Sequence, residues 1–231
     1  MIMRIVISIG GSVLVPGLSK DRIEEYAGVV DQIIAEGNSV GIVVGGGRIA
    51  RDYIEIAREF GSNESELDQM GIAITRVNAQ LLMLGINHKF GQLPPQDYES
   101  AKQILHQEGV VVMGGVAPGQ TTDAVGAALA EYTDADLLIY ATSVDGVYDS
   151  DPKLNPKATR YDELAPGELV EIISSMEMIA GNPAPVDLLA SKLIERSGIK
   201  TVVIDGSDPK NVINAVLHGK YNGTIINSDM K

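Results

Sequence analysis

Short apolar runs alternate with amphipathic segments along most of the chain. Five of these runs are rich in Val, Ile and Leu and are too short for a helix: residues 5–9, 40–44, 110–113, 137–141 and 201–204. Continuous apolar runs of this length are typical of strands that are buried on both faces of a parallel sheet. The pattern therefore predicts five buried strands.

The segments between these runs repeat apolar residues every three or four positions. In the first segment, Ile23, Tyr26, Val30 and Ile33 fall on one face of a helix. The helices predicted in this way cover residues 22–36, 49–60, 69–84, 97–106, 122–131, 185–196 and 209–217. Strands that alternate with helices form parallel βαβ units. We therefore expect an α/β fold, a three-layer αβα sandwich with a mainly parallel central sheet, in a single domain.

Glycine motifs follow the predicted strands. They come directly after the first three strands and close to the end of the last: Gly10-Gly11-Ser12, Gly45-Gly46-Gly47, Gly114-Gly115 and Gly206. In parallel sheets, ligands bind beyond the carboxyl ends of the strands, and glycine allows the backbone to approach a ligand closely. The positions of the glycines thus indicate an anion or nucleotide site at this edge of the sheet.

Composition narrows the function classes. The chain of 231 residues has 31 acidic and 18 basic side chains and a formal net charge of −13, which argues against a nucleic-acid partner. It has no cysteine, which excludes disulfides, thiolate metal sites and cysteine nucleophiles. No apolar run approaches the ~18 residues that span a membrane. We expect a cytoplasmic protein without a membrane partner, and interpret the apolar N-terminal segment as a strand.

Known phosphate-binding motifs fit poorly. The chain lacks the G-x-x-x-x-G-K-[ST] pattern of a P-loop. Gly45-x-Gly47-x-x-Ala50, with Asp68 about twenty residues on, resembles a dinucleotide-binding fingerprint. The acidic residue of that fingerprint ends the next strand, whereas Asp68 comes just before the predicted helix 69–84. We therefore reject a dinucleotide-binding site.

Charged side chains beside the glycine motifs are candidates for contacts with phosphate. Arg48 and Arg51 follow the triple glycine, where a guanidinium can bind phosphate through two hydrogen bonds or simply be solvated. Asp123 follows Thr121 and Thr122 at the start of a predicted helix, where it either caps the helix or takes part in a site; we favour the site. Arg76 is interpreted as a solvated charge.

Several motifs in order resemble one family. They are Gly10-Gly11-Ser12, Gly45-Gly46-Gly47-x-x-x-Arg51, Gly119-x-Thr121-Thr122-Asp123-Ala124 and Thr142-x-Val144-Asp145-Gly146-Val147-Tyr148-x-x-Asp151-Pro152. Together they resemble the amino-acid-kinase superfamily. The segment Asp68-x-Met70-Gly71-x-x-x-Thr75-x-x-Asn78 is similar to the uridylate (UMP) kinases within it, most closely to their archaeal form. The likeness extends over nearly the whole chain.

The resemblance implies a function and an organisation. It implies reversible transfer of the γ-phosphoryl group of ATP to UMP, in pyrimidine nucleotide biosynthesis, with Mg²⁺ carried by ATP and no fixed metal site. It also implies one domain over residues 1–231, in which an N-terminal lobe, about 1–118, binds UMP and a C-terminal lobe, about 119–231, binds ATP. Family members of this kind are commonly homohexamers.

The resemblance also implies roles for individual residues. Those at positions that bind UMP are Gly46, Asp68, Val116, Ala117, Pro118, Gly119, Gln120, Thr121 and Thr122. Those at positions that bind ATP are Gly10, Gly11, Gly47, Arg51, Thr142, Tyr148 and Asp151. Supporting positions are Ser12, Gly45 and Asp123.

One position departs from the bacterial relatives, which carry a Lys on the first strand where this chain has Ser8. Lys192, on a late helix, matches a lysine that contacts phosphate in acetylglutamate kinase. We expect Arg51 and Lys192 to be the catalytic cations. Two alternatives stay open: a kinase of the same superfamily with another acceptor (isopentenyl phosphate, carbamate or N-acetylglutamate), and a nucleotide sensor without turnover.

Overall fold

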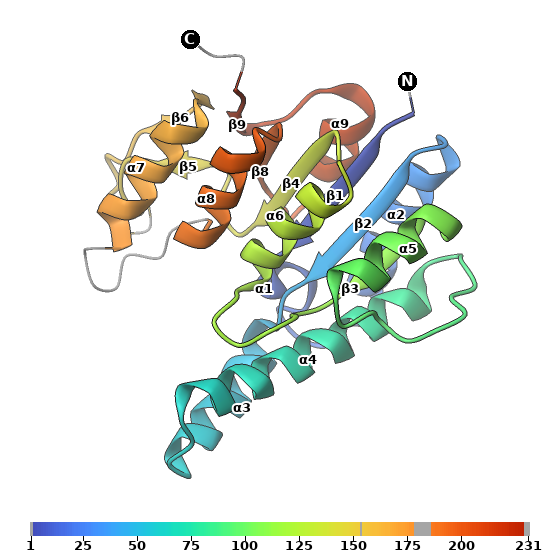
Figure 1. Cartoon of the computed structure of the whole chain (residues 1–231). Helices are drawn as coiled ribbons and strands as arrows, with labels where there is room; N and C mark the ends of the chain where they lie inside the picture. The colour runs from blue at the N-terminus through green and yellow to red at the C-terminus, as the bar shows by residue number, and fades with distance from the viewer. Residues whose placement is uncertain (1, 153, 178–185, 229–231) are drawn as a thin grey trace.

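The computed structural model describes residues 2–152, 154–177 and 186–228 and has one large sheet. Seven strands form it, in the order β3-β2-β1-β4-β8-β9-β7 (Figure 1). In that order they are Val110–Met113, Ser39–Val44, Arg4–Ile9, Leu137–Thr142, Thr201–Asp205, Gly223–Ile226 and Glu163–Leu164. The five strands expected from the apolar runs are the first five of this order, each found to within one residue at either end.

Most of the sheet is parallel. β1 pairs in parallel with both β2 and β4, β2 with β3, and β4 with β8. β9 runs antiparallel to β8, and β7 is parallel to β9. The carboxyl ends of the five parallel strands therefore meet at one edge, where the glycine motifs lie.

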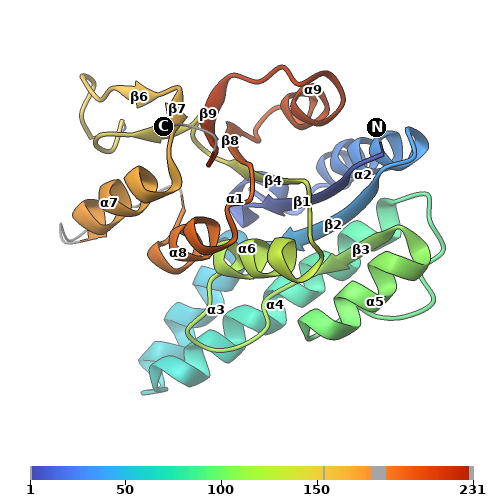
Figure 2. The same cartoon turned by 45° about the horizontal axis from the view of Figure 1, so that its top comes forward.

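Helices cover both faces of the sheet (Figure 2). Alternate residues of β1 separate the two cores: Ile5 and Ile7 belong to one, and Val6 to the other. The first core includes residues of α1 (Gly11–Leu14), α2 (Lys20–Ala35), the end of α4 (Glu64–Gly85) and α9 (Lys210–His218). The second includes residues of α5 (Tyr98–Glu108), α6 (Thr122–Tyr132), α7 (Pro166–Glu177) and α8 (Leu188–Ser197). This arrangement confirms the three-layer αβα sandwich.

α3 (Gly47–Glu59) and the first half of α4 project beyond the sheet as an antiparallel pair (Figure 1). Ala50 is buried on α3, whereas Tyr53, Ile56 and many charged side chains of the same helix are exposed. α4 begins in a capping box, in which the Asn63 side chain accepts a hydrogen bond from the Glu66 N–H. The pair forms one side of the edge where the strands end.

The sequence pattern misses six elements, most of them short. These are β5 (Val147–Tyr148) and β6 (Arg160–Tyr161), which form a separate two-stranded sheet, together with β7, β9, α1 and α7. α4 begins at Glu64, so the expectation that Asp68 precedes this helix is wrong, although Asp68 still does not end a strand. Pro185, the first residue of one expected helix, lies outside the described residues, and α8 begins at Leu188. Within the described ranges, no helix has the length and apolar character needed to cross a membrane.

Candidate active site

Two adjoining cavities open at the carboxyl ends of the strands. The first has a volume of about 320 Å³ and lies between the loop after β1, the end of β4 and the hairpin of β5 and β6. The second, of about 500 Å³, lies between the loops after β1, β2 and β3 and one face of α4. Ser12 and Arg51 line both cavities. A molecule in one cavity would therefore meet a molecule in the other beside these two side chains.

The first cavity brings together most of the residues that were expected to bind ATP. The expected residues in its wall are Gly10, Arg51, Thr142, Tyr148 and Asp151, with the supporting residues Ser12 and Asp123. Six further residues, which were not expected as contacts, complete this wall: Ser143, Val144, Gly146, Ser150, Pro152 and Met176. All except Met176 belong to loops that flank an expected residue.

The second cavity brings together residues that were expected to bind UMP. Gly46, Asp68, Gln120, Thr121 and Thr122 line it. Gly11 and Gly47, which were expected at the ATP phosphates, also lie here, close to the shared boundary. The other wall residues are Ser12, Ala50, Arg51, Ile54, Gly71, Ile72, Thr75 and Gly115. Asp68, Gly71, Ile72 and Thr75 recur at the spacing of one helix face, a signal that the sequence already contained.

The first two glycine turns pack directly against each other. A Cβ atom on Gly11 would lie 2.0 Å from the Gly47 nitrogen, and one on Gly45 would lie 2.4 Å from the Gly11 nitrogen. Gly47 also has a φ of 68°, in the left-handed region that favours glycine. Glycine is therefore required here so that the loops after β1 and β2 can meet.

α4 fixes the glycine turns through its polar side chains. The Asn78 amide donates to the backbone oxygens of Gly45 and Gly46, at 2.9 and 3.2 Å. The buried hydroxyl of Thr75 accepts a hydrogen bond of 2.7 Å from the Gly115 N–H. The Thr75 and Asn78 positions of the sequence motif thus set the backbone that surrounds the second cavity.

Asp68 and Arg76 hold the loop that follows β3. Asp68 Oδ2 accepts a hydrogen bond of 2.8 Å from the Gly119 N–H. The Arg76 guanidinium donates to the backbone oxygens of Gly115 and Val116, at 3.1 and 3.4 Å. The expectation that Arg76 is a solvated charge is wrong, because its guanidinium supplies donors to a loop whose carbonyls point toward α4.

The remaining expected residues lie outside the described walls of both cavities. Val116, Ala117, Pro118 and Gly119 belong to the loop that Asp68 and Arg76 hold, and Gly45 packs against Gly11. The Lys192 side chain is 54% exposed, and its ammonium lies 3.1 Å from a carboxylate oxygen of Glu195 on the same helix. Its expected contact with phosphate stays a prediction.

Asp123 lies where the N-termini of α6 and α8 meet. Thr121, not Asp123, caps α6 by accepting a hydrogen bond from the Ala124 N–H, and Asp187 caps α8. Asp123 accepts a hydrogen bond of 3.3 Å from the Ser8 hydroxyl on β1. Burial raises the pKa of the Asp123 carboxyl to about 7, the charge of Asp187 adds to this shift, and the bond from Ser8 opposes it. Ser8 therefore has a defined partner in the wall of the first cavity.

This raised pKa predicts a pH dependence of stability. Between an ordinary carboxyl pKa of about 4 and the folded value of about 7, the folded chain retains a proton that the unfolded chain has lost. Stability that depends on Asp123 therefore falls as pH rises through this range. Asn at position 123 does not titrate, so Asp123→Asn removes this pH dependence. As pH rises from about 5.5 to about 8, we expect the free energy of unfolding of the variant to increase by on the order of 2 kcal/mol relative to that of wild type.

Thermal unfolding of both proteins across that pH range measures this difference. Asp136→Asn is the matched control, because Asp136 is an exposed carboxylate outside the walls of both cavities that accepts a hydrogen bond from the Arg4 N–H. The difference in stability between Asp136→Asn and wild type should not change with pH above 5.5. Parallel curves for wild type and Asp123→Asn would contradict a raised pKa at Asp123.

The donor set near the cavities bears on metal binding. No group of three or more His, Asp or Glu side chains in the part of the chain that the structure describes could hold a metal ion. Asp123 and Asp151 each place a carboxylate in the wall of the first cavity. Mg²⁺ needs only one or two protein carboxylates when substrate phosphates supply its other ligands. The residues present therefore fit a Mg²⁺ ion that is held mainly by a nucleotide.

Comparisons with known proteins identify the family of the chain. The sequence profile of the amino acid kinase family matches residues 3–205. The uridylate kinase of Halobacterium salinarum is 52% identical over 227 residues, which cover 98% of this chain and 94% of the relative. That of Haloquadratum walsbyi is 53% identical over 224 residues, or 97% and 93% of the two chains.

Solved structures of uridylate kinases are similar to this chain in fold as well as in sequence. The crystal structure of uridylate kinase from Archaeoglobus fulgidus matches with a TM-score of 0.87 and 47% identity, over 97% of this chain and all of the other. The UMP kinase of Bacillus anthracis matches with a TM-score of 0.79 and 25% identity, over 98% and 96% of the two chains. On this sequence and structural similarity, the chain belongs to the amino acid kinase family, with archaeal uridylate kinases among its relatives.

Proposed function

We propose that this chain is a UMP kinase, which transfers the γ-phosphoryl group of ATP reversibly to UMP and yields ADP and UDP. The observation that carries the proposal is the pair of adjoining cavities, which share Ser12 and Arg51. Two-substrate phosphoryl transfer requires donor and acceptor to be held in contact, in line and away from bulk water. The uridylate kinase relatives, at about half identity over nearly the whole chain, support UMP as the acceptor.

The proposal assigns one substrate to each cavity. The second cavity, built by α4 and the loops of the N-terminal lobe of about 1–118, takes UMP, with Asp68 toward the ribose. The loop of residues 116–122 closes over it. The first cavity takes ATP, with Thr142, Tyr148 and Asp151 around the adenosine and Gly10 near the phosphates. The C-terminal lobe, about 119–231, supplies most of that wall.

The chemistry needs charge stabilisation more than a general base. A phosphate oxygen of UMP attacks the γ-phosphorus, the bond from that phosphorus to the β–γ bridging oxygen breaks, and its electron pair leaves with ADP. The second pKa of a phosphomonoester is near ~6, so the acceptor is already largely deprotonated at pH 7. This agrees with a site whose described walls contain no histidine.

Three features of the chain stabilise the transferred charge. Arg51 reaches both cavities and offers a planar pair of donors to phosphate oxygens. The N-terminus of α3 lies in the wall of the second cavity, and no side chain caps its first N–H groups, which can therefore donate to an anion. Lys192 is the third, and it must turn away from Glu195 to contribute. Mg²⁺ that arrives with ATP neutralises part of the phosphate charge.

The first experiment measures ADP release with Mg²⁺-ATP against UMP, CMP, dUMP, AMP and GMP, with isopentenyl phosphate, carbamate and N-acetylglutamate alongside. We expect turnover with UMP far above all others. Turnover with another acceptor would leave the assignment of ATP to the first cavity in place and overturn the assignment of UMP to the second cavity. ATP binding without turnover on any acceptor would favour the nucleotide sensor, the alternative raised by Ser8.

Asp68 gives a sharper test of the acceptor cavity. Asp68→Ala removes both a proposed ribose contact and the hydrogen bond to the Gly119 N–H. Hydrogen bonds to charged groups contribute about 1.5–3 kcal/mol, so we expect the KM for UMP to rise by about 10- to 100-fold. The KM for ATP should change by less than about twofold.

Steady-state kinetics with each substrate varied in turn measure this separation. Asp52→Ala is the matched control, because Asp52 is an exposed carboxylate on α3 that pairs with Arg48. It should leave both KM values unchanged. Equal increases in the KM for UMP and for ATP would count against UMP in the second cavity.

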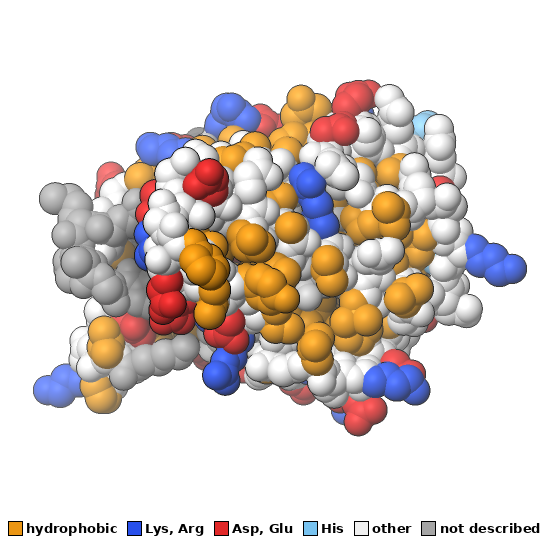
Figure 3. Space-filling view, turned by 90° about the horizontal axis from the view of Figure 1, so that it is seen from below, with side chains coloured by type: hydrophobic (Ala, Val, Ile, Leu, Met, Phe, Trp, Pro, Cys, Tyr) orange, Lys and Arg blue, Asp and Glu red, His pale blue; other side chains and the backbone are white. Residues whose placement is uncertain are grey.

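We also propose that the chain assembles as a homohexamer in the cytoplasm, where ATP and UMP are available. The face of the molecule that is seen from below carries many hydrophobic side chains (Figure 3). Leu18, Val77 and Leu84 are 70%, 58% and 81% exposed, and they line one groove of about 600 Å³ between α2 and α4. Burial of such a face between copies would remove apolar surface from water. Light scattering of the purified protein measures the number of 24.5 kDa chains in the particle.

A further inference from the structure

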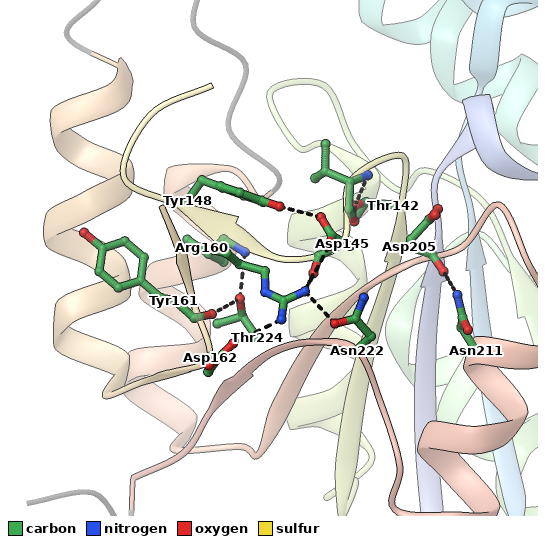
Figure 4. Close-up of polar contacts among 12 residues, drawn as sticks. Thr142, Asp145, Tyr148, Arg160, Tyr161, Asp162, Asp205, Asn211, Asn222 and Thr224 are labelled. Atoms are coloured by element: carbon green, nitrogen blue, oxygen red, sulfur yellow. Dashed lines mark hydrogen bonds and ion pairs between the residues drawn. The ribbon is translucent and has the colours of Figure 1, made fainter. Parts of the chain in front are cut away.

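A short hairpin forms one wall of the first cavity. Its two strands, β5 and β6, pair antiparallel, with Tyr148 opposite Arg160. Tyr148 and Gly146 line the cavity, whereas Arg160 stands behind them, between the hairpin and the end of the main sheet (Figure 4). The sequence motifs included Tyr148 and Asp145 but gave no role to Arg160.

The Arg160 guanidinium joins three parts of the chain. Its Nη1 donates to Asp145 Oδ2 at 2.9 Å and to Asn222 Oδ1 at 2.8 Å, and its Nη2 donates to Asp162 Oδ1 at 3.1 Å. The Arg160 side chain is 23% exposed, so these contacts are partly shielded from water. Figure 4 shows the guanidinium between the turn that precedes β5 and Asn222, which precedes β9. Arg160 therefore fixes the turn relative to the sheet.

Asp145 passes this constraint on to Tyr148. The Tyr148 hydroxyl donates a hydrogen bond of 2.7 Å to Asp145 Oδ1, and the other oxygen of the same carboxylate accepts from Arg160. Burial acts to raise the pKa of the Asp145 carboxyl, but the hydrogen bond from Tyr148 and the charge of Arg160 outweigh it and lower the pKa. Asp145 is thus an ionised acceptor for both groups. The direction of the Tyr148 ring in the cavity wall depends on a carboxylate that Arg160 holds.

The hairpin has a second attachment that does not involve the guanidinium. Thr224 on β9 accepts a hydrogen bond of 2.8 Å from the Val147 N–H and donates to the Tyr161 backbone oxygen. Gly146 has a φ of 148°, and a Cβ atom there would lie 2.6 Å from Thr224 Oγ1, so the turn packs closely on β9. Loss of the guanidinium would therefore release Asp145 and Tyr148 while Thr224 still holds the hairpin.

We propose that Arg160 is a positioning residue for ATP, which acts through Asp145 to hold Tyr148 in the wall of the nucleotide cavity. This inference rests on the proposed function, because it takes the first cavity as the ATP site. Tyr148 fixed in one orientation presents its ring to the nucleoside without first losing conformational freedom, and such preorganisation favours binding. Arg160 itself does not have to touch the nucleotide.

Calorimetric titration with a non-hydrolysable ATP analogue and Mg²⁺, without an acceptor, tests the proposal on the whole protein. We expect Arg160→Ala to raise the Kd about tenfold and Tyr148→Phe to raise it by a similar factor. Both substitutions disrupt the same interaction through Asp145. The Kd of the double variant should therefore be no higher than the higher Kd of the two single variants. In turnover assays, Arg160→Ala should raise the KM for ATP and leave the KM for UMP within about twofold.

Two further variants separate positioning from general support of the fold. Asp162→Ala removes an Arg160 partner that is 82% exposed, and it should leave the Kd within about twofold of wild type. Arg160→Lys keeps a charge that can reach Asp145, so its Kd should lie between those of wild type and Arg160→Ala. If Arg160→Ala does not fold, Arg160→Lys and Asp145→Asn test the same link, and each should weaken binding.

Other results would overturn the proposal. It fails if Arg160→Ala binds the analogue as wild type does, if the effects of Arg160→Ala and Tyr148→Phe multiply, or if the KM for UMP rises as much as that for ATP. A wild-type protein that does not bind the analogue would instead overturn the ATP assignment of the first cavity. The two failures are therefore distinguishable.

Discussion

Arg51→Ala is expected to reduce kcat by about 10²- to 10³-fold. Arg51 is the charged side chain that lines both cavities within the described walls, so its guanidinium lies where the phosphoryl group would pass between substrates. Loss of one preorganised donor to transition-state charge typically costs 10²–10³ in kcat. Arg51→Lys keeps the charge but loses the planar pair of donors, and we expect a loss of about tenfold.

ADP release under saturating ATP and UMP measures this effect. Arg58→Ala is the matched control, because Arg58 lies at the other end of α3 and pairs with Glu64 away from both cavities. It should keep the wild-type kcat. Lys192→Ala is the informative comparison. A similar loss of kcat would show that Lys192 also stabilises the transferred phosphoryl group, whereas a wild-type kcat would show that Arg51 acts without it. A change of less than threefold in Arg51→Ala would show that transfer does not occur at the shared boundary.

Gly11→Ala is expected to destabilise the protein by about 4 kcal/mol or more. The new Cβ would lie 2.0 Å from the Gly47 nitrogen and 2.7 Å from the Gly45 carbonyl carbon, both of them backbone atoms. The turns could separate only by breaking hydrogen bonds such as that from the Asn78 amide to the Gly45 oxygen. Losses of this size are exceptional for a single methyl group and require a clash that the backbone cannot relieve.

Thermal unfolding measures the loss, and UMP binding shows whether the second cavity survives in any folded fraction. Gly28→Ala is the matched control, since Gly28 lies inside α2 and a Cβ atom there meets nothing within 4 Å. It should be neutral or stabilise by about 0.5–1 kcal/mol, because alanine is the better helix former. A Gly11→Ala protein with the Tm of wild type would mean that the two turns do not touch.

The sheet was predictable because its strands are buried on both faces. A continuous apolar run such as residues 40–44 is removed from water only when helices cover both faces of its strand. The run therefore predicts both the strand and the helical layers around it. The two-residue strands β5 and β6 have no such signal, because the hairpin is held by contacts of Arg160 and Val147 with Asn222 and Thr224, which are distant in the sequence. The true start of α4 was marked in the sequence by Asn63 and Glu66, which form a capping box.

The candidate site was predictable in its residue types and less so in its contacts. Motifs placed Arg51, Thr142 and Tyr148 beside one cavity, as the structure has them. The backbone contacts of Arg76 and the bond between Ser8 and Asp123 join positions 39 or more residues apart, and no local pattern encodes them. Such contacts depend on how loops meet, which only the assembled fold determines.

The polar side chains of α4 limit how the length of this helix beside the second cavity can change. From one continuous helix of 22 residues, Asp68 and Thr75 bind the loop after β3, and Asn78 binds the loop after β2. Each residue of an α-helix turns by about 100°, so one residue inserted between Asp68 and Thr75 would rotate one set of contacts away from the other. We therefore expect an insertion within α4 to disrupt these contacts even if every residue of the helix is kept.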